Sequence, residues 1–189
     1  MRVIAGLAKG KPLAHVPGTS TRPITDRVKS AVFNILGDAV VDASFLDLFA
    51  GTGGVGIEAL SRGAARAVFV EQGRRAIETI RRNLRETNLA ARAEVRQADV
   101  FAYLKHAPAE PFDFIYIAPP QYQGLWLKTL QALDAPAWLA AGGQVIVQIF
   151  PKELTPFELP HLAVSDQRRY GSTLVLFLTH RAGAPGPEG

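Results

Sequence analysis

Three glycines and one acidic residue form the most informative group in the sequence. Gly51, Gly53 and Gly56 have the spacing G-x-G-x-x-G, and Asp47 precedes them in the otherwise apolar run 45–49. Glycines between a strand and a helix let a ligand lie against bare backbone, and the helix start offers unpaired N–H groups. This spacing predicts a site for a nucleotide-like cofactor.

Asp47 narrows the kind of cofactor. A carboxylate at the end of this strand repels a pyrophosphate, whereas it suits a ligand with an ammonium group and no phosphate. S-adenosylmethionine (SAM) is such a ligand. The alternative is a structural glycine turn in which Asp47 only caps the following helix.

Two later acidic residues extend the predicted cofactor site. Glu71 lies 20 residues after Gly51, where a carboxylate can accept hydrogen bonds from both ribose hydroxyls. Asp99 follows the next expected strand and can accept from an adenine amino group, cap a helix, or do both. The residues expected to hold the cofactor are Asp47, Phe49, Ala50, Gly51, Thr52, Gly53, Gly56, Glu71, Gln72, Asp99 and Val100.

The elements that must position these residues alternate between strands and helices. Strands are expected at 44–49, 66–70, 94–97, 112–117 and 144–150, and helices at 54–62, 73–88, 99–105 and 123–133. A hairpin of strands 2–5 and 11–16 and a helix at 25–36 precede them, and two strands at 161–180 follow. The pattern predicts an α/β, Rossmann-like, doubly wound and mostly parallel sheet of seven strands, with an antiparallel last strand.

Length and composition favour one domain with a sizeable core. The chain has 189 residues, 48% of them hydrophobic and none of them cysteine, which excludes a Cys-based metal site. We expect a single domain over 1–180, with a basic extension at 1–24, a catalytic core at 25–180 and a disordered tail at 181–189. We expect no signal peptide, no membrane span and no metal, and a cytoplasmic monomer.

The positive charge is concentrated near the N-terminus. Residues 1–30 hold six basic residues and one acidic residue, whereas the remaining 159 hold fifteen and sixteen. Such a patch is typical of a surface that binds nucleic acid, although an ordinary solvated face is the alternative. The candidate RNA-binding residues are Arg2, Lys9, Lys11, Arg22, Arg27 and Lys29.

The order of these motifs resembles a class I SAM-dependent methyltransferase that acts on an amino nitrogen. More narrowly, the chain resembles the bacterial small-subunit ribosomal RNA guanine-N2 methyltransferases over about residues 1–178. The segments that carry the resemblance are 21–29 with Phe33-Asn34, 46–53, 58–64, 69–71, Asn83-Leu84, 118–122 and Tyr170-Gly171. The segment 21–29 is the most specific, because many methyltransferases share the glycine and Pro-Pro motifs.

One departure from the family pattern falls on the chemistry. The family has Asp-Pro-Pro-Tyr, or Asn-Pro-Pro-Tyr in relatives, where this chain has Ala-Pro-Pro-Gln-Tyr. The resemblance implies that the target amine is held there and that an aromatic ring stacks on the base. Ala118 has no side-chain acceptor, so backbone carbonyls and the Gln121 amide must take that part. The candidate catalytic residues are Ala118, Pro119, Pro120, Gln121 and Tyr122.

These observations predict a SAM-dependent enzyme that methylates N2 of a guanine in small-subunit ribosomal RNA, either naked or in a particle. Three alternatives remain open. One is a methyltransferase for another amino nitrogen of a nucleic acid base. Another is a non-catalytic, SAM-binding ribosome assembly factor, which the loss of the acid at Ala118 would allow. The third is an NAD-dependent oxidoreductase, against which Asp47 and the Pro-Pro motif argue.

Overall fold

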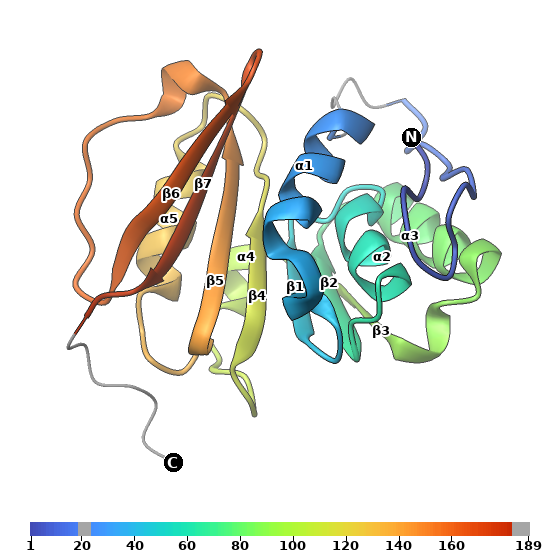
Figure 1. The fold of residues 1–189 in the computed structure, drawn as a ribbon, viewed down its shortest axis with the longest axis horizontal. Coiled ribbons are helices and arrows are strands. Elements are labelled where there is room, and N and C mark those ends of the chain that lie inside the picture. The colour runs from blue at the N-terminus through green and yellow to red at the C-terminus, as the bar shows by residue number, and fades with distance from the viewer. Residues whose placement is uncertain (19–23, 183–189) are drawn as a thin grey trace. The chain divides into compact units, whose positions relative to one another are not determined.

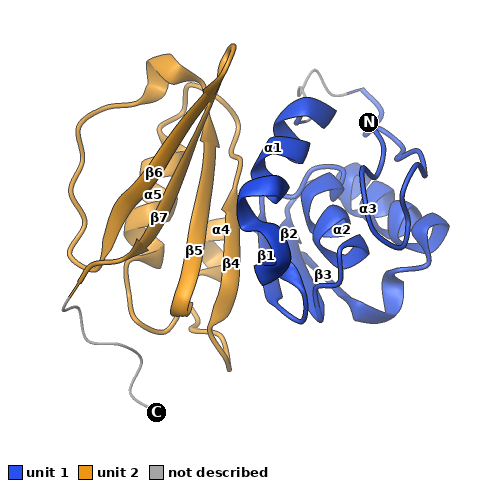
Figure 2. Cartoon of the chain, viewed as in Figure 1, with its two compact units in different colours: residues 1–99 blue, residues 100–189 orange. Residues whose placement is uncertain are grey.

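A computed structural model describes residues 1–18 and 24–182. The chain divides into two compact units, residues 1–99 and 100–189 (Figure 2). Each unit is described by itself below. The single domain over 1–180, its boundary at 24 and 25 and its disordered tail stay predictions.

The first unit contains a three-stranded parallel sheet in the order β3-β2-β1 (Figure 1). Its strands are β1 (Ser44–Leu48), β2 (Arg66–Glu71) and β3 (Ala93–Gln97). Its helices are α1 (Asp26–Leu36), α2 (Gly54–Ser61) and α3 (Arg74–Thr87), with short 3₁₀ turns η1 (Gly37–Val40) and η2 (Ala90–Arg92). All lie within a few residues of the expected ranges, because their apolar periodicity is strong.

Gly56 sets how closely α2 packs against the sheet. A Cβ at this position would lie 2.4 Å from Cε1 of Phe69 in β2. Only glycine lets helix and strand approach to this distance, so Gly56 serves packing. Its role therefore differs from that of Gly51 and Gly53, which lie in the turn before α2.

Helix α1 begins where the sequence predicts. The Thr25 hydroxyl accepts a hydrogen bond from the Val28 N–H at 3.3 Å, as an N-cap does. Its buried face contains Val28, Val32, Phe33 and Leu36, whereas Ile35 is 41% exposed. Phe33 stacks on Phe45 of β1.

The N-terminal segment, residues 1–16, does not form the two expected strands. Its two arms still pair, through the antiparallel bridge between Arg2 and Pro12 and through hydrogen bonds from the Val3 N–H to the Lys11 carbonyl at 3.0 Å and from the Leu13 N–H to the Met1 carbonyl at 3.1 Å. The turn between the arms bonds to α2, since Leu7 donates to the Ser61 carbonyl at 2.8 Å and Ala8 donates to the Ser61 hydroxyl at 2.9 Å. The hairpin is therefore present, but its arms are not regular strands.

The second unit contains four strands in the order β4-β5-β7-β6 (Figure 1). Strands β4 and β5 are parallel, and β7 is antiparallel to both β5 and β6. The elements are α4 (Val100–Tyr103), β4 (Phe112–Ile117), α5 (Leu125–Leu133), β5 (Leu139–Ile149), η3 (Pro151–Glu153), β6 (Leu162–Tyr170) and β7 (Thr173–His180). With the three of the first unit, the described residues contain the seven strands expected.

Strand β5 begins five residues earlier than predicted. Gly142 and Gly143 lie inside the strand, where its register with β4 shifts between Phe112 and Phe114. A Cβ at Gly143 would lie 2.7 Å from the Asp113 carbonyl, so the irregularity needs glycine. No helix in the described residues is long and apolar enough to cross a membrane.

Candidate functional site

The glycine-rich turn after β1 has the unusual backbone that its sequence predicts. Gly51 and Gly53 have φ angles of 57° and 76°, and Gly53 is the N-cap of α2. Phe49 also has a positive φ of 59°, which costs a non-glycine residue about 1–2 kcal/mol. A Cβ at Gly51 would meet nothing nearer than the Phe49 carbonyl at 3.9 Å. The Gly51 backbone is thus open to a ligand.

Asp47 lies beneath this turn and is only 2% exposed. Its Oδ2 accepts a hydrogen bond from the Gly56 N–H at 2.9 Å. Burial raises the pKa of Asp47 to about 8, the Gly56 hydrogen bond opposes that rise, and the Glu71 charge adds to it. Asp47 therefore satisfies one N–H in the first turn of α2, and a nearby cation would offset the cost of ionising this buried carboxyl.

Glu71 holds the glycine-rich turn against the start of α3. Its Oε2 accepts from the Gly51 N–H at 3.0 Å, and its Oε1 accepts from the Gly73 N–H at 2.9 Å. Glu71 is half-buried at the end of β2, the strand beside β1. The two parallel strand ends thus bring Asp47 and Glu71 to one turn, as the sequence predicted.

The remaining predicted cofactor residues have different surroundings. Gln72 and Asp99 are exposed, and Asp99 directly precedes α4. Val100 is buried and is the first residue of the second unit. Ala50 is buried, and its N–H donates to the Val70 carbonyl at 3.1 Å. Thr52 is half-buried within the turn.

Asn83 is a site residue whose role the sequence did not reveal. It is fully buried in α3, and its Nδ2 donates to the carbonyls of Thr52 at 2.9 Å and Ala14 at 3.2 Å. Its Oδ1 accepts from the Ala14 N–H at 2.8 Å. Asn83 thus ties the cofactor turn to the N-terminal segment. The available signal was a polar residue beside the apolar stripe of α3.

The segment 118–122 follows β4 directly in the second unit. Ala118 and Pro119 are half-buried, whereas Pro120, Gln121 and Tyr122 are exposed. Tyr122 is 66% exposed, and its φ of 61° lies in the left-handed region. An exposed aromatic ring on a strained backbone is typical of a binding loop.

Glu153 and Phe150 surround Tyr122, and no sequence motif pointed to them. The Glu153 carboxylate accepts from the Tyr122 N–H through Oε1 at 2.7 Å and from the Phe150 N–H through Oε2 at 3.1 Å. The rings of Tyr122 and Phe150 lie 5.7 Å apart, centroid to centroid, with 51° between their planes. They lie 28 residues apart in the chain, so spacing gave no signal.

The predicted RNA-binding residues do not form one exposed set. Lys9 and Arg27 are exposed, and the Arg2 side chain is 68% exposed, 3.7 Å from Asp26. Lys11 is half-buried and donates to the Glu86 carbonyl at 2.9 Å. Arg22 lies outside the described residues.

The prediction that Lys29 binds RNA is wrong. Its side chain has no exposed surface, and its Nζ lies 3.2 Å from Oε2 of Glu58, which is equally buried. The same Nζ donates to the Arg2 carbonyl at 2.7 Å. Burial lowers the pKa of Lys29, although the Glu58 carboxylate opposes the shift. Charge counting could not reveal this, because a buried ion pair and a basic patch have the same composition.

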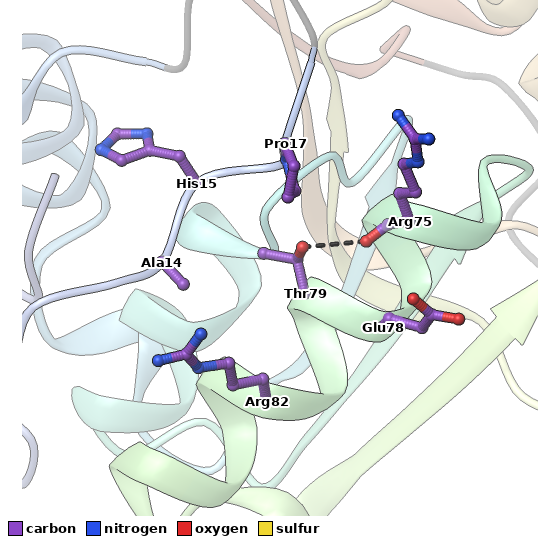
Figure 3. Close-up of a pocket in the computed structure, with 7 residues that line it drawn as sticks. All are labelled: Ala14, His15, Pro17, Arg75, Glu78, Thr79 and Arg82. Atoms are coloured by element: carbon purple, nitrogen blue, oxygen red, sulfur yellow. Dashed lines mark hydrogen bonds between the residues drawn. The ribbon is translucent and has the colours of Figure 1, made fainter.

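Helix α3 carries basic residues that the sequence analysis did not select. Arg74 and Arg82 pair with Glu78 and Glu86 at 3.1 and 2.7 Å. Within the described part of the chain, the exposed Arg75, Arg81 and Arg85 have no ion pair. Of these three, Arg75 lines a shallow hollow of about 300 Å³ (Figure 3). Its lining residues are Ala14, His15, Pro17, Arg75, Glu78, Thr79 and Arg82.

A buried acid before a glycine-rich turn, and a second acid that holds this turn from the next parallel strand, define a Rossmann-like cofactor-binding protein. The chain belongs to the family described as Conserved hypothetical protein 95, whose model matches residues 1–179.

Two curated relatives support this membership. "Putative rRNA methyltransferase YlbH" of Bacillus subtilis is 37% identical over 96% of this chain and 100% of its own length. Ribosomal RNA small subunit methyltransferase D of Escherichia coli is 35% identical over 78% of this chain and 74% of its own length.

Solved structures have the same fold. "Putative methyltransferase yhhF" from Escherichia coli is 30% identical, with a TM-score of 0.85 over 97% of this chain and 99% of its own. An RNA methyltransferase from Salinibacter ruber in complex with S-adenosyl-L-homocysteine is 18% identical, with a TM-score of 0.63 over 88% and 98%. The expected Rossmann-like methyltransferase fold is confirmed.

Proposed function

We propose that this protein is a SAM-dependent methyltransferase of small-subunit ribosomal RNA, and that its target is the exocyclic N2 of a guanine. The observation that carries the proposal is the family match over residues 1–179, together with relatives named as ribosomal RNA methyltransferases. The buried acid and the open glycine backbone suit the SAM cofactor and disfavour a dinucleotide.

The cofactor site fits the chemistry of SAM. The Asp47 carboxylate attracts the ammonium of the cofactor's amino-acid end, which offsets the cost of ionising a buried acid. Glu71 would accept hydrogen bonds from the ribose hydroxyls, and Asp99 would accept one from the adenine amino group. When bound, SAM supplies the methyl group. The protein's own residues bind the cofactor and the base, orient the amine and exclude water from it.

The segment 118–122 receives the target base. The base must leave its stack to reach a pocket, and the exposed Tyr122 ring offers a stacking surface. Carbonyls of Ala118 and Pro119, with the Gln121 amide, hold the amine in line for attack. Methyl transfer needs alignment and desolvation more than a strong base, because the methylated nitrogen is already acidic. Ala118 therefore permits activity.

The RNA backbone contacts basic residues of the first unit. These are the exposed Arg2, Lys9 and Arg27 and the half-buried Lys11, extended by the exposed Arg75, Arg81 and Arg85 of α3. Phosphate contacts by Lys and Arg supply sequence-independent affinity and position the substrate. We place the protein in the cytoplasm, where ribosomal RNA is found, and a monomer remains our prediction.

The rival function is a non-catalytic assembly factor, favoured by the missing acid at Ala118. Labelled SAM separates the two when small-subunit particles and their naked RNA are both offered. The enzyme produces N2-methylguanosine, identified by mass mapping, and Tyr122→Ala loses most turnover while still binding SAM. Absence of transfer to every substrate, with normal SAM binding, would favour the assembly factor.

A further inference from the structure

Glu153 forms hydrogen bonds with Tyr122, 31 residues earlier in the chain, and with Phe150, three residues earlier. One oxygen holds the backbone N–H of Tyr122 at 2.7 Å, and the other holds that of Phe150 at 3.1 Å. A carboxylate that accepts two backbone N–H groups fixes both in direction as well as distance. The side chain therefore acts as a brace between the loop after β4 and the end of β5.

The brace restrains the backbone positions of Tyr122 and Phe150, whose rings face each other. Tyr122 adopts a φ of 61°, a conformation that L residues avoid, and its N–H is the group that Glu153 holds. A charge-assisted hydrogen bond is strong enough to offset such strain. The result is a tilted ring pair with centroids 5.7 Å apart, one ring largely exposed.

The bond from the Phe150 N–H to Glu153 is a local capping box at the start of η3, but that box does not involve Tyr122. The chain after η3 has its own anchor, because Phe157 packs edge-on against the buried Trp126 at 5.3 Å. What the second bond of Glu153 adds is a fixed backbone position for Tyr122, a residue that is 66% exposed and so contributes little to the core.

We propose that Glu153 is a positioning residue for methyl transfer, which sets Tyr122 and Phe150 as a two-ring platform for the target base. This inference rests on the proposed function, in which segment 118–122 receives that base. The carboxylate touches neither base nor cofactor. It acts through the Tyr122 backbone, and a tilted pair of rings accepts a planar purine by stacking on one ring and edge contact with the other.

The test compares substitutions at Glu153 under saturating SAM with small-subunit particles as substrate. Glu153→Gln keeps one acceptor and turns an NH₂ group towards the other N–H, so kcat falls about ten- to a hundredfold. The Kd for SAM stays within twofold, and KM for the particles changes less than kcat. Glu153→Asp keeps both oxygens and recovers part of the loss.

A double-mutant cycle distinguishes positioning from an independent contribution. Because Glu153 acts through Tyr122, Glu153→Gln added to Tyr122→Ala lowers kcat no further than Tyr122→Ala alone. Glu158→Gln is the matched control. It removes another glutamate of the same connection, one that is 85% exposed and 3.4 Å from Arg181, and it leaves kcat unchanged.

Two results would overturn the inference: unchanged kcat in Glu153→Gln, or full additivity with Tyr122→Ala. Loss of SAM binding or of thermal stability in Glu153→Gln but not in Glu158→Gln would also overturn it, in favour of a folding role. Absence of transfer by the unmodified protein would instead contradict the proposed function, so the two failures are distinguishable.

Discussion

Asp47 shows how much a single buried group determines at this site. An acid with a pKa of about 8 is mostly protonated at pH 7, yet a bound ammonium requires its charged form. Cofactor binding and proton release are therefore linked at this residue.

That linkage gives a signed pH dependence. In the free protein Asp47 keeps its proton up to about pH 8, whereas in the SAM complex it loses the proton at a lower pH. SAM affinity therefore rises with pH, by at most about tenfold per pH unit. The cofactor's own α-amino group stays charged below about pH 7.7. Calorimetry between pH 6 and 7.5, in buffers with different ionisation enthalpies, measures both affinity and proton release.

Asp47→Asn is the control for this prediction. It binds SAM weakly and releases no proton, whereas a flat affinity profile for the unmodified protein would separate Asp47 from the ammonium.

The same raised pKa of Asp47 makes the folded state bind more protons than the unfolded one between about pH 4 and 8. Its contribution to stability is thus greatest at the acidic end of that range and is lost as pH rises.

Lys29 is predicted to stabilise the fold without binding RNA. Lys29→Met leaves the buried Glu58 with Arg62, whose Nε lies 2.8 Å from Oε1, as its remaining cation. We expect a loss of about 3 kcal/mol in the free energy of unfolding, from urea denaturation. Arg27→Met on the exposed side of α1 is the control and changes stability by less than about 0.5 kcal/mol.

The RNA-binding assay gives the complementary result. The salt dependence of RNA binding is unaltered in Lys29→Met at a temperature where the variant is folded. A reduced salt slope with full stability would return Lys29 to the RNA-binding surface.

At the scale of elements, one glycine allows the N-terminal segment to lie close to α2. A Cβ at Gly6 would lie 1.8 Å from the Ser61 carbonyl, whereas a Cβ at Gly10 would meet nothing within 4 Å. Both glycines have nearly the same φ, 81° and 82°. They are a matched pair in which backbone strain is equal and only the close approach differs.

Gly6→Ala should therefore detach the segment from α2, and Gly10→Ala should not. Amide hydrogen exchange at Leu7 and Ala8, whose N–H groups bond to Ser61, measures this. We expect protection to be lost in Gly6→Ala and mostly kept in Gly10→Ala, which costs about 1–2 kcal/mol of strain. Equal protection in the two variants would contradict the docking.

The basic face of α3 and the Lys9–Lys11 turn are expected to act as one RNA-binding surface. Changing Arg75, Arg81 and Arg85 to Gln should lower the salt slope of RNA binding by about three units if each contacts one phosphate. SAM affinity should stay unchanged. Arg168→Gln in β6, where Arg168 pairs with Asp166 at 3.0 Å, is the control, and an equal fall there would indicate only a general charge effect.

At the scale of the whole molecule, the sequence predicted what local periodicity determines. Strands such as β1, β2 and β4 and a helix such as α3 have apolar patterns that few other structures can bury, so their observed ranges are close to those expected. The acids at the ends of β1 and β2 came together because parallel strands end at one edge. Motif and topology were sufficient there.

The sequence could not predict contacts that depend on distant partners. The ion-pair partner of Lys29 gave no local signal, because Glu58 lies 29 residues later in α2, even though Lys29 shares the buried side of α1 with Val32 and Phe33 and Arg27 does not. Likewise Glu153 resembles any surface glutamate until the Tyr122 and Phe150 N–H groups lie beside it. The arms of the N-terminal hairpin are not regular strands for the same reason, because Glu58 and Ser61 of α2 accept hydrogen bonds from the N–H groups of Ile4 and Ala8.

The N-terminal segment also has a consequence for biosynthesis. Its partners come much later in the chain, since Ile4 bonds to Glu58, Ala14 to Asn83 and Lys11 to Glu86 at separations of 54, 69 and 75 residues. In a chain that emerges from a translating ribosome, Ile4 can bond only after α2 has left the exit tunnel, and Lys11 and Ala14 only after α3 has left it. The first residues to appear are thus among the last of their unit to be fixed, and nascent chains arrested before Asn83 should leave them open to protease.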